Sequence, residues 1–233
     1  MKFLTPKKPA HLSKYAKECL EALVKADVAN TISLGGAFGL FHYYDYRPTH
    51  DVDAWWNENV TDVKKQAVVD ILQSTLEKYG SVRVRIWGDL TSVELTQENI
   101  TVFSFQIAFR TQRLNDLNDA GWINVPLDSF DDLVATKMNA LIQRGAPRDF
   151  LDIYTICQAK LISIVKCWNL WHKRQGLIGN EHDASKARLA IETHLERISL
   201  QRPLEQIKDD QERENAKQVR EWFLNSFLQV IDE

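Results

Sequence analysis

Two aspartates separated by a single residue, Asp51 and Asp53, are the strongest chemical signal in the sequence. They stand at the beginning of a predicted strand, Val52 to Trp56, which is rich in β-branched and aromatic residues. Side chains two positions apart on a strand share a face, so the two carboxylates should lie together. Adjacent anions repel, but Mg²⁺ binds one or two protein carboxylates and completes its shell with water and phosphate oxygens. The pair therefore predicts a magnesium site beside a phosphate ligand.

A glycine pair, Gly35-Gly36, precedes the acids and follows a short predicted strand at Ile32 to Leu34. Ala37 to Tyr44 then predicts a helix, so this segment is a strand, a glycine turn and a helix. Bare backbone amides at a helix start favour phosphate, because they are unsatisfied and the helix dipole is positive there. Each motif alone is often just a turn or an exposed strand start, but in this order both suit one phosphate-bearing ligand.

The composition is that of a folded protein with no strong overall positive or negative charge. The 233 residues are 44% hydrophobic, and 29 lysines and arginines against 32 acids leave a net charge of −3. Nucleic acid binding would therefore need a local basic patch. No segment approaches the roughly 20 apolar residues of a membrane span, and three widely spaced cysteines suit neither disulfides nor zinc. We expect a cytoplasmic protein with no membrane partner.

The order of predicted elements indicates an α/β (α+β) protein. Helices are expected from Leu12 to Val28 and from Val60 to Lys78, by their apolar spacing. Three further strands are expected at Val82 to Trp87, Ser92 to Leu95 and Ile100 to Phe109. Together with the two strands above, they predict a mixed sheet of about five strands.

The sequence from residue 129 onward has helical spacing throughout. Helices interrupted at Gly145-Ala146-Pro147 are followed by others at 160–174, 184–199 and 211–231. We therefore predict an α/β core at residues 1–128 and a helical C-terminal region at 129–233 that packs on it. A weaker hypothesis gives the last helices a role in dimerisation through Trp222 and Phe223.

Two blocks of sequence carry a family resemblance. The first is Leu34-Gly35-Gly36-Ala37 followed by Arg47-x-Thr49-x-Asp51-Val52-Asp53. The second is the segment from Leu133 to Asp152, LVATKMNALIQRGAPRDFLD. Both blocks, in this order, resemble the motifs of the AbiEii/AbiGii-type toxin nucleotidyltransferases. The resemblance covers roughly residues 31–160, and the rest of the chain rests on helical pattern alone.

The resemblance implies a nucleotidyltransferase-like fold, a mixed sheet flanked by helices with a helical C-terminal part. It implies transfer of a nucleotide from a nucleoside triphosphate to an RNA or protein acceptor, since members act on tRNA ends or on proteins. It further implies Mg²⁺ or Mn²⁺ as cofactor, and it allows a role as the toxin of a toxin–antitoxin system with an antitoxin protein as partner.

The same resemblance implies roles in the first block. Asp51 and Asp53 would hold the metal and serve catalysis, because bound magnesium activates the attacking group and balances charge on the phosphates. Gly35 and Gly36 would cradle the triphosphate, with Thr49 also at the nucleotide.

In the second block, the resemblance implies that Lys137 and Asp149 are catalytic and that Arg144, Arg148 and Asp152 bind nucleotide. Lys137 and Arg144 fall two helical turns apart on one face, and both would present cations to phosphate oxygens. The two acids would orient those cations or the acceptor. The simpler interpretation is a solvated helix face with ordinary ion pairs to Asp131, Asp132 or Asp149.

One departure from the family pattern concerns the third carboxylate that this fold usually supplies from a central strand. The strand expected at residues 100–109 contains no acid. Alternation directs Phe103, Phe105, Ile107 and Phe109 to the core and puts Gln106 at the acidic position. Either Glu94 on the preceding strand supplies the charge, or the chain is a catalytically impaired nucleotide-binding or protein-interaction relative. Both alternatives stay open, and the sequence names neither the base nor the acceptor.

Overall fold

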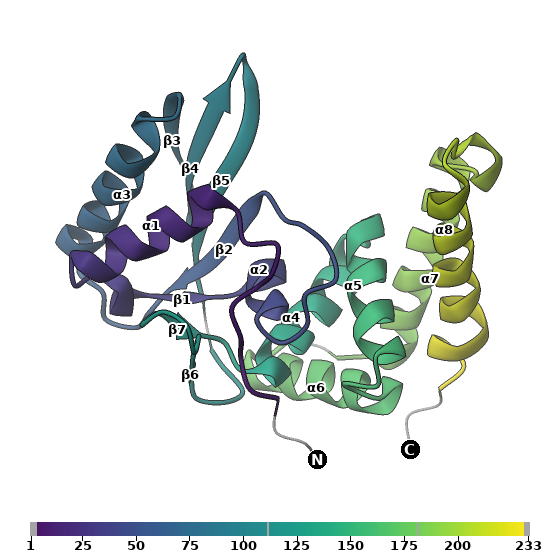
Figure 1. Cartoon of the computed structure of the whole chain (residues 1–233). Coiled ribbons are helices and arrows are strands. Elements are labelled where there is room, and N and C mark those ends of the chain that lie inside the picture. Colours follow the sequence, from purple (N-terminus) through teal and green to yellow (C-terminus); the bar gives the residue numbers. More distant parts are fainter. Residues whose placement is uncertain (1–3, 111, 181, 231–233) are drawn as a thin grey trace. The chain divides into compact units, whose positions relative to one another are not determined.

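A computed structural model describes residues 4–110, 112–180 and 182–230 (Figure 1). The chain divides into two compact units, residues 1–133 and 134–233, and the division falls inside helix α4, Phe130–Gln143. Within the described residues, no helix is both long and apolar enough to cross a membrane.

The first unit is built on a mixed sheet of seven strands in the order β3-β4-β5-β2-β1-β7-β6. Strands β2 and β5 run parallel, whereas β4 is antiparallel to both β3 and β5. The strands are β1 Ile32–Leu34, β2 Asp51–Trp56, β3 Ser81–Trp87, β4 Leu90–Gln97, β5 Ile100–Phe109, β6 Asn118–Asp119 and β7 Pro126–Leu127. The predicted mixed α/β class is confirmed.

The predicted number of strands was wrong because β6 and β7 went unseen. Each has two residues, which is too short for alternation to be visible in a sequence. They exist because the sheet extends to them: Leu127 pairs with Leu34 of β1 and with Asn118 of β6. Pairing with a distant strand thus defines these elements.

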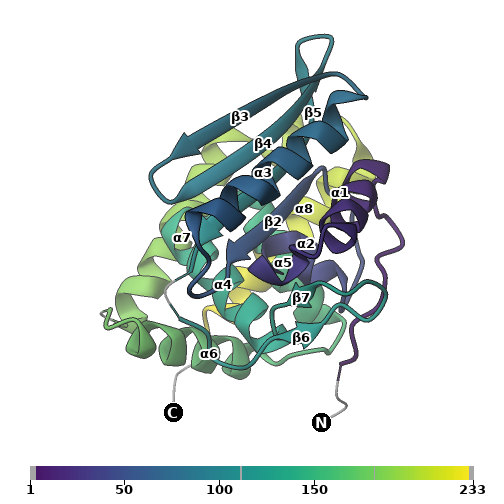
Figure 2. The same cartoon turned by 90° about the vertical axis from the view of Figure 1, so that its left-hand side faces the viewer.

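The helices of the first unit are α1 Lys14–Lys25, α2 Gly36–Phe41 and α3 Asp62–Glu77. Helices α1 and α3 each begin two residues later than predicted, because a side chain caps the first turn of each helix. The hydroxyls of Ser13 and Thr61 accept the amides of Ala16 and Lys64, which sets each first turn. Figure 2 shows α1 and α3 side by side over one face of the sheet.

The core of the first unit lies between those two helices and the sheet. Val52, Phe103, Phe105 and Ile107 are buried there, as alternation predicts. Phe109 is the exception, since its side chain is 50% exposed. Phe109 is the last residue of β5. Its ring lies next to the Lys65 ammonium, which is 4.6 Å from the ring centroid. The opposite sheet face therefore carries the other set of strand residues, including both aspartates.

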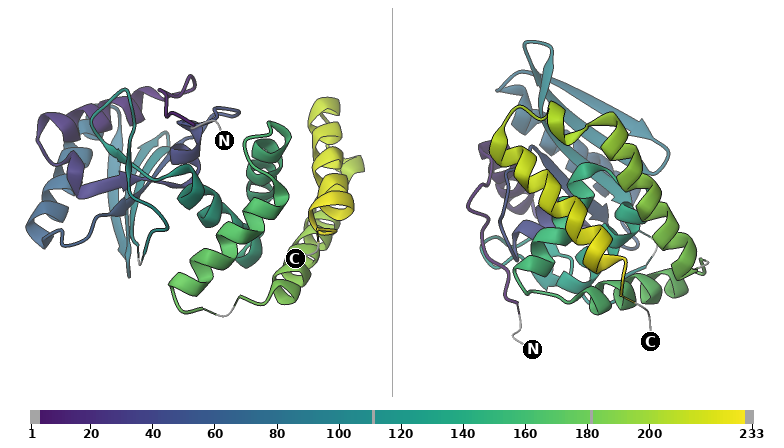
Figure 3. Two further views of the ribbon diagram at one scale, coloured as in Figure 1. Left: turned by 90° about the horizontal axis from the view of Figure 1, so that it is seen from below. Right: turned by 90° about the vertical axis from the view of Figure 1, so that its right-hand side faces the viewer.

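The second unit contains the rest of α4 and the helices that follow, with a final π-helical turn at Phe223–Phe227. These helices are α5 Pro147–Gln158, α6 Ile164–Leu177, α7 Ala184–Gln201 and α8 Asp210–Trp222. The right-hand view of Figure 3 shows α7 and α8 as an antiparallel hairpin. The helical prediction is confirmed here, while Ile231, its expected end, lies outside the described residues.

Aromatic side chains hold the second unit together. The Phe150 and Phe223 rings are 4.8 Å apart, and Trp168 lies 5.5 Å from Phe227. Phe223 is fully buried, and Trp222 packs at 5.4 Å on Tyr154. The dimerisation hypothesis was wrong about Phe223, because a side chain inside its own unit's core offers no surface to a second copy.

Candidate functional site

The two aspartates begin β2 on the sheet face opposite the core. Asp51 and Asp53 are both half-buried, whereas Val52 and Ala54 between and after them are buried. Thr49 sets the start of the strand: its hydroxyl lies 3.2 Å from both the amide nitrogen and the carbonyl oxygen of Asp51. Strand alternation thus places the two carboxylates together, as the sequence predicts.

The glycine turn packs directly against the residues of β2. A Cβ atom on Gly36 would lie 2.0 Å from Asp53 Oδ2, and one on Gly35 would lie 2.1 Å from Trp55 Nε1. Gly36 also has a φ of +56°, which disfavours other residues. The amide of Gly35 donates to the carbonyl oxygen of Asp53 at 2.9 Å. Both glycines are therefore required by close packing on β2, whatever ligand the turn accepts.

Asp53 lies at the first turn of α2. Its Oδ2 atom accepts the backbone amide of Ala37 at 3.3 Å, a long hydrogen bond. The carboxylate thus shares the space in front of the glycine turn with any phosphate that the turn would bind. The two halves of the first block form one local site.

A row of polar residues crosses the sheet beside the acids. Gln106 of β5 is directly opposite Asp53, and Ser104 is directly opposite Asp51. The Ser104 hydroxyl donates to Asp51 Oδ1 at 2.7 Å, and Gln106 Nε2 donates to the Ser104 oxygen at 3.1 Å. Ser104 therefore holds the Asp51 carboxylate, and Gln106 occupies the position predicted for a third acid.

Glu94 lies one strand farther from the acids. Its register partner is Ser104, so it is two strands and about 10 Å from Asp51. Its carboxylate lies 3.3 Å from Arg85 Nε and accepts the Ser92 hydroxyl at 3.4 Å. Over the part of the chain that the structure describes, no group of three or more His, Cys, Asp or Glu residues is placed to hold a metal.

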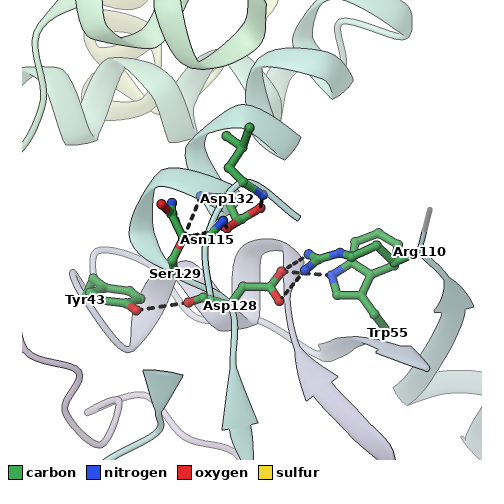
Figure 4. A network of polar contacts seen from close by, with 8 residues as sticks. Tyr43, Trp55, Arg110, Asn115, Asp128, Ser129 and Asp132 are labelled. Carbon is green, nitrogen blue, oxygen red and sulfur yellow. Dashed lines mark hydrogen bonds and ion pairs between the residues drawn. The ribbon is translucent and has the colours of Figure 1, made fainter. Parts of the chain in front are cut away.

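A buried ion pair next to the glycine turn was not found from the sequence (Figure 4). Asp128 accepts both terminal nitrogens of the Arg110 guanidinium, one of them at 2.8 Å, and the indole Nε1 of Trp55 at 3.1 Å. Burial raises the pKa of Asp128, although the charge of Arg110 opposes that shift. The hydrogen bond from Trp55 to Asp128 holds the indole ring against Gly35, and this contact helps to fix the glycine turn.

Further hydrogen bonds tie this pair to the start of α4, as Figure 4 shows. The Tyr43 hydroxyl donates to the Asp128 carbonyl oxygen at 3.0 Å, and burial raises the pKa of Tyr43 to about 12. The Ser129 hydroxyl accepts the amide of Asp132 at 3.0 Å, and the Asp132 carboxylate accepts the amide of Leu114 at 2.8 Å. No periodic pattern or motif marks these residues, which explains why sequence reasoning missed them.

The second block forms two ion pairs between the end of α4 and α5. Lys137 Nζ lies 2.6 Å from Asp152 Oδ2, and both side chains are at most 6% exposed. Arg144 donates two hydrogen bonds of 2.8 and 2.9 Å to Asp149. Burial opposes ionisation of Asp149, but these bonds, with the charges of Arg144 and Lys137, outweigh it and lower its pKa. One of the ion-pair partners named by the simpler interpretation, Asp149, is thus observed.

Arg144 directly follows α4, which ends at Gln143, and its amide still donates to the carbonyl oxygen of Ala140 at 3.0 Å, as in a helix. Arg148, in the first turn of α5, lines a cavity between α5, α7 and α8 and, among the described residues, forms no ion pair with Asp149 or Asp152. The structure therefore brings together Lys137, Arg144 and the two acids, and leaves Arg148 apart.

The family described as nucleotidyl transferase AbiEii toxin, type IV TA system, matches residues 18–226, a range that includes both blocks. No curated protein matches. Among solved structures, an antigenic nucleotidyltransferase-like protein from Paracoccidioides brasiliensis is 15% identical, with a TM-score of 0.40 over 91% of this chain and 95% of that chain.

Proposed function

Because this chain belongs to the AbiEii family of nucleotidyl transferase toxins, we propose that it transfers a nucleotide from a nucleoside triphosphate to an RNA acceptor, using Mg²⁺ or Mn²⁺. The family suggests nucleotidyl transfer within a toxin–antitoxin system, so an antitoxin partner is part of the proposal. The observation that carries it is the pair Asp51 and Asp53 on one face of β2, with Asp53 at the glycine turn.

The donor atoms at this site fit a hard divalent cation. Two carboxylates, from Asp51 and Asp53, and the side-chain oxygen of Gln106 are all oxygen ligands, which magnesium prefers. A cation bound there would lower the pKa of the attacking hydroxyl and balance charge on the phosphates. Ser104 positions Asp51 through its 2.7 Å hydrogen bond. Since Gln106 is neutral, the site has one negative charge fewer than a site with three acids.

We propose phosphate-binding roles for two sets of groups, each taken within its own unit. In the first unit we assign the amide of Gly36 to a phosphate, because the Gly35 amide already donates to the carbonyl oxygen of Asp53. Lys137 and Arg144 would supply positive charge, while Asp152 and Asp149 keep each cation in one orientation through the pairs described above. This assignment rests on the family motifs and on the geometry of each block by itself.

The acceptor is assigned from the edge strand of the sheet. Arg83, Arg85 and Trp87 alternate on β3, and the strand register places them on the same face as the two aspartates, with Arg85 about 15 Å from Asp53. Trp87 is 51% exposed, and the Arg85 guanidinium lies 5.2 Å from its ring centroid. An exposed ring that stacks bases beside cations that meet phosphates suits single-stranded RNA. Because the whole chain has a net charge of −3, RNA binding needs a local basic patch, and we assign that role to these arginines.

The test is transfer of label from each α-labelled nucleoside triphosphate to total tRNA with Mg²⁺. We expect one triphosphate to label RNA, and Asp51→Asn to remove the activity. Asp62→Asn is the matched control, because that side chain is 97% exposed on α3, over the opposite sheet face. Label transfer that survives Asp51→Asn, or its absence with every triphosphate and metal, would contradict the proposal.

A second candidate is nucleotide binding without catalysis, and the neutral Gln106 opposite Asp53 favours it. Calorimetry separates the two candidates. A catalytic metal site predicts that Mg²⁺ strengthens triphosphate binding and that Asp53→Asn removes this effect. Affinity that changes with neither Mg²⁺ nor Asp53→Asn supports the binding protein.

A further inference from the structure

A cavity of about 330 Å³ lies within the helical unit, between α5, α7 and α8. Its walls are mainly apolar, and its volume falls at the lower end of the range for small-molecule sites, roughly 300–1,000 Å³. The wall residues that matter here are Phe150, Leu195, Ile198, Ile207 and Val219. An aliphatic or aromatic body would replace water there at a gain in free energy.

The polar residues of the same cavity carry an excess of positive charge. Three arginines, Arg148, Arg202 and Arg220, line it together with one acid, Glu212. Arg202 forms an ion pair with Glu212 at 2.8 Å, and Arg220 donates a hydrogen bond to the backbone oxygen of Arg202 at 2.7 Å. Burial and then the charge of Arg202 lower the pKa of Arg220, while the charge of Glu205 opposes that shift. The three arginines outnumber these two acids, so the cluster keeps positive charge for an anionic ligand.

We propose that this cavity binds a small molecule with an aliphatic body and one anionic head group, of which a medium-chain carboxylate is the simplest case. The body would lie on Phe150 and Val219, and the head group would meet Arg148 and Arg220. A guanidinium binds a carboxylate through two parallel hydrogen bonds, which gives the ligand a fixed orientation. A nucleoside triphosphate does not fit this chemistry, because its polar groups would face apolar walls. The site is thus separate from the proposed nucleotidyl transfer.

The experiment uses the full chain and octanoate as the probe, with calorimetry and thermal unfolding as readouts. We expect saturable octanoate binding, a raised Tm, and no binding of octylamine, which has the same chain and the opposite charge. Arg148→Met or Arg220→Met should weaken binding about tenfold or more, because a charge-assisted hydrogen bond is lost. Lys173→Met on α6, an exposed cation outside the cavity, should leave the affinity unchanged.

Filling the cavity gives an independent check. Ala216 lines it from α8, so Ala216→Trp should abolish octanoate binding, and the smaller Ala216→Leu serves if the first variant does not fold. Octanoate that fails to bind the wild type, octylamine that binds equally well, or unchanged affinity in the filled variant would overturn the site. Competition between octanoate and ATP would also overturn it, because it would place octanoate at the nucleotide. Transfer activity does not enter these outcomes.

Discussion

The two blocks of charged residues differ in how their acids are arranged. In the first unit, Asp51 and Asp53 lie side by side, half-buried, with neutral Ser104 and Gln106 as strand partners. In the second unit, each buried acid faces a cation, Asp152 with Lys137 and Asp149 with Arg144. The first block places two carboxylates next to each other, whereas in the second block each acid lies beside a cation. Substitutions in the first block should therefore mainly change ligand binding and activity, and substitutions in the second block should mainly change stability.

The largest expected effect comes from the first block. Asp51→Asn should lower nucleotidyl transfer about a thousandfold or more, since a metal ligand contributes several kcal/mol at the transition state. Stability should stay the same or rise, because the variant relieves repulsion from Asp53. Transfer assays and urea denaturation measure the two quantities. A large loss of stability with activity retained would reverse the comparison.

The second block should show the opposite pattern. Lys137→Met removes the buried cation that lies 2.6 Å from the Asp152 carboxylate, and it should cost about 3–5 kcal/mol of unfolding free energy in urea denaturation. The double variant Lys137→Met/Asp152→Leu should recover much of that loss, because no charge stays buried. Lys173→Met on the surface of the same unit is the control. If Lys137→Met were neutral for stability, the pair would not be structural.

Acid should act on the two units in different pH ranges. Burial lowers the pKa of His42 in the first unit to about 4, from an ordinary 6.5. Because its folded pKa is below its unfolded one, its contribution is complete above pH 6.5 and falls by about 3 kcal/mol as the pH drops to 4. The lowered pKa of Asp149 in the second unit acts only below its ordinary 3.8.

Urea denaturation at several pH values measures these contributions. His42→Phe should flatten the dependence between pH 6.5 and 4, and Arg144→Met should remove the part below about pH 4 that comes from the lowered pKa of Asp149. A steep dependence that persists in His42→Phe between pH 6.5 and 4 would show that another group titrates there.

A smaller effect is expected from restoring a third acid to the first block. Gln106→Glu should raise Mg²⁺ affinity about tenfold, since affinity follows the number of charged ligands. Calorimetry with Mg²⁺ and a triphosphate measures it, and Glu94→Gln serves as the control one strand farther away. Equal effects from both positions would mean that Glu94 takes part after all.

The smallest effect concerns the acceptor surface. Arg83→Ala and Arg85→Ala should each reduce the slope of log affinity for RNA against log salt by about one, with little sequence preference. Trp87→Ala should weaken binding without changing that slope, because stacking involves no released counterion. Filter binding at several salt concentrations measures both. A slope that is unchanged in the arginine variants would move the acceptor surface elsewhere.

Local patterns allowed much of this molecule to be predicted. The strand at Ile100–Phe109 was predicted with its observed bounds, and the acid pair was placed correctly on β2, because alternation depends only on neighbours in the chain. The helix break at Gly145 and Pro147 was visible for the same reason. The strands β6 and β7 were not, since two residues contain no period.

Which side chains contact one another could be learned only from the tertiary structure. The choice between Glu94 and Gln106 depends on β5 lying between β4 and β2, an order produced by long connections that leave no mark in local spacing. The pairing of Asp128 with Arg110 and the position of Arg148 at the cavity between α5, α7 and α8 likewise depend on tertiary contacts. Residue types and spacing thus determined which groups are able to bind metal and phosphate. Only packing in three dimensions decided which of their charges are already balanced within the protein.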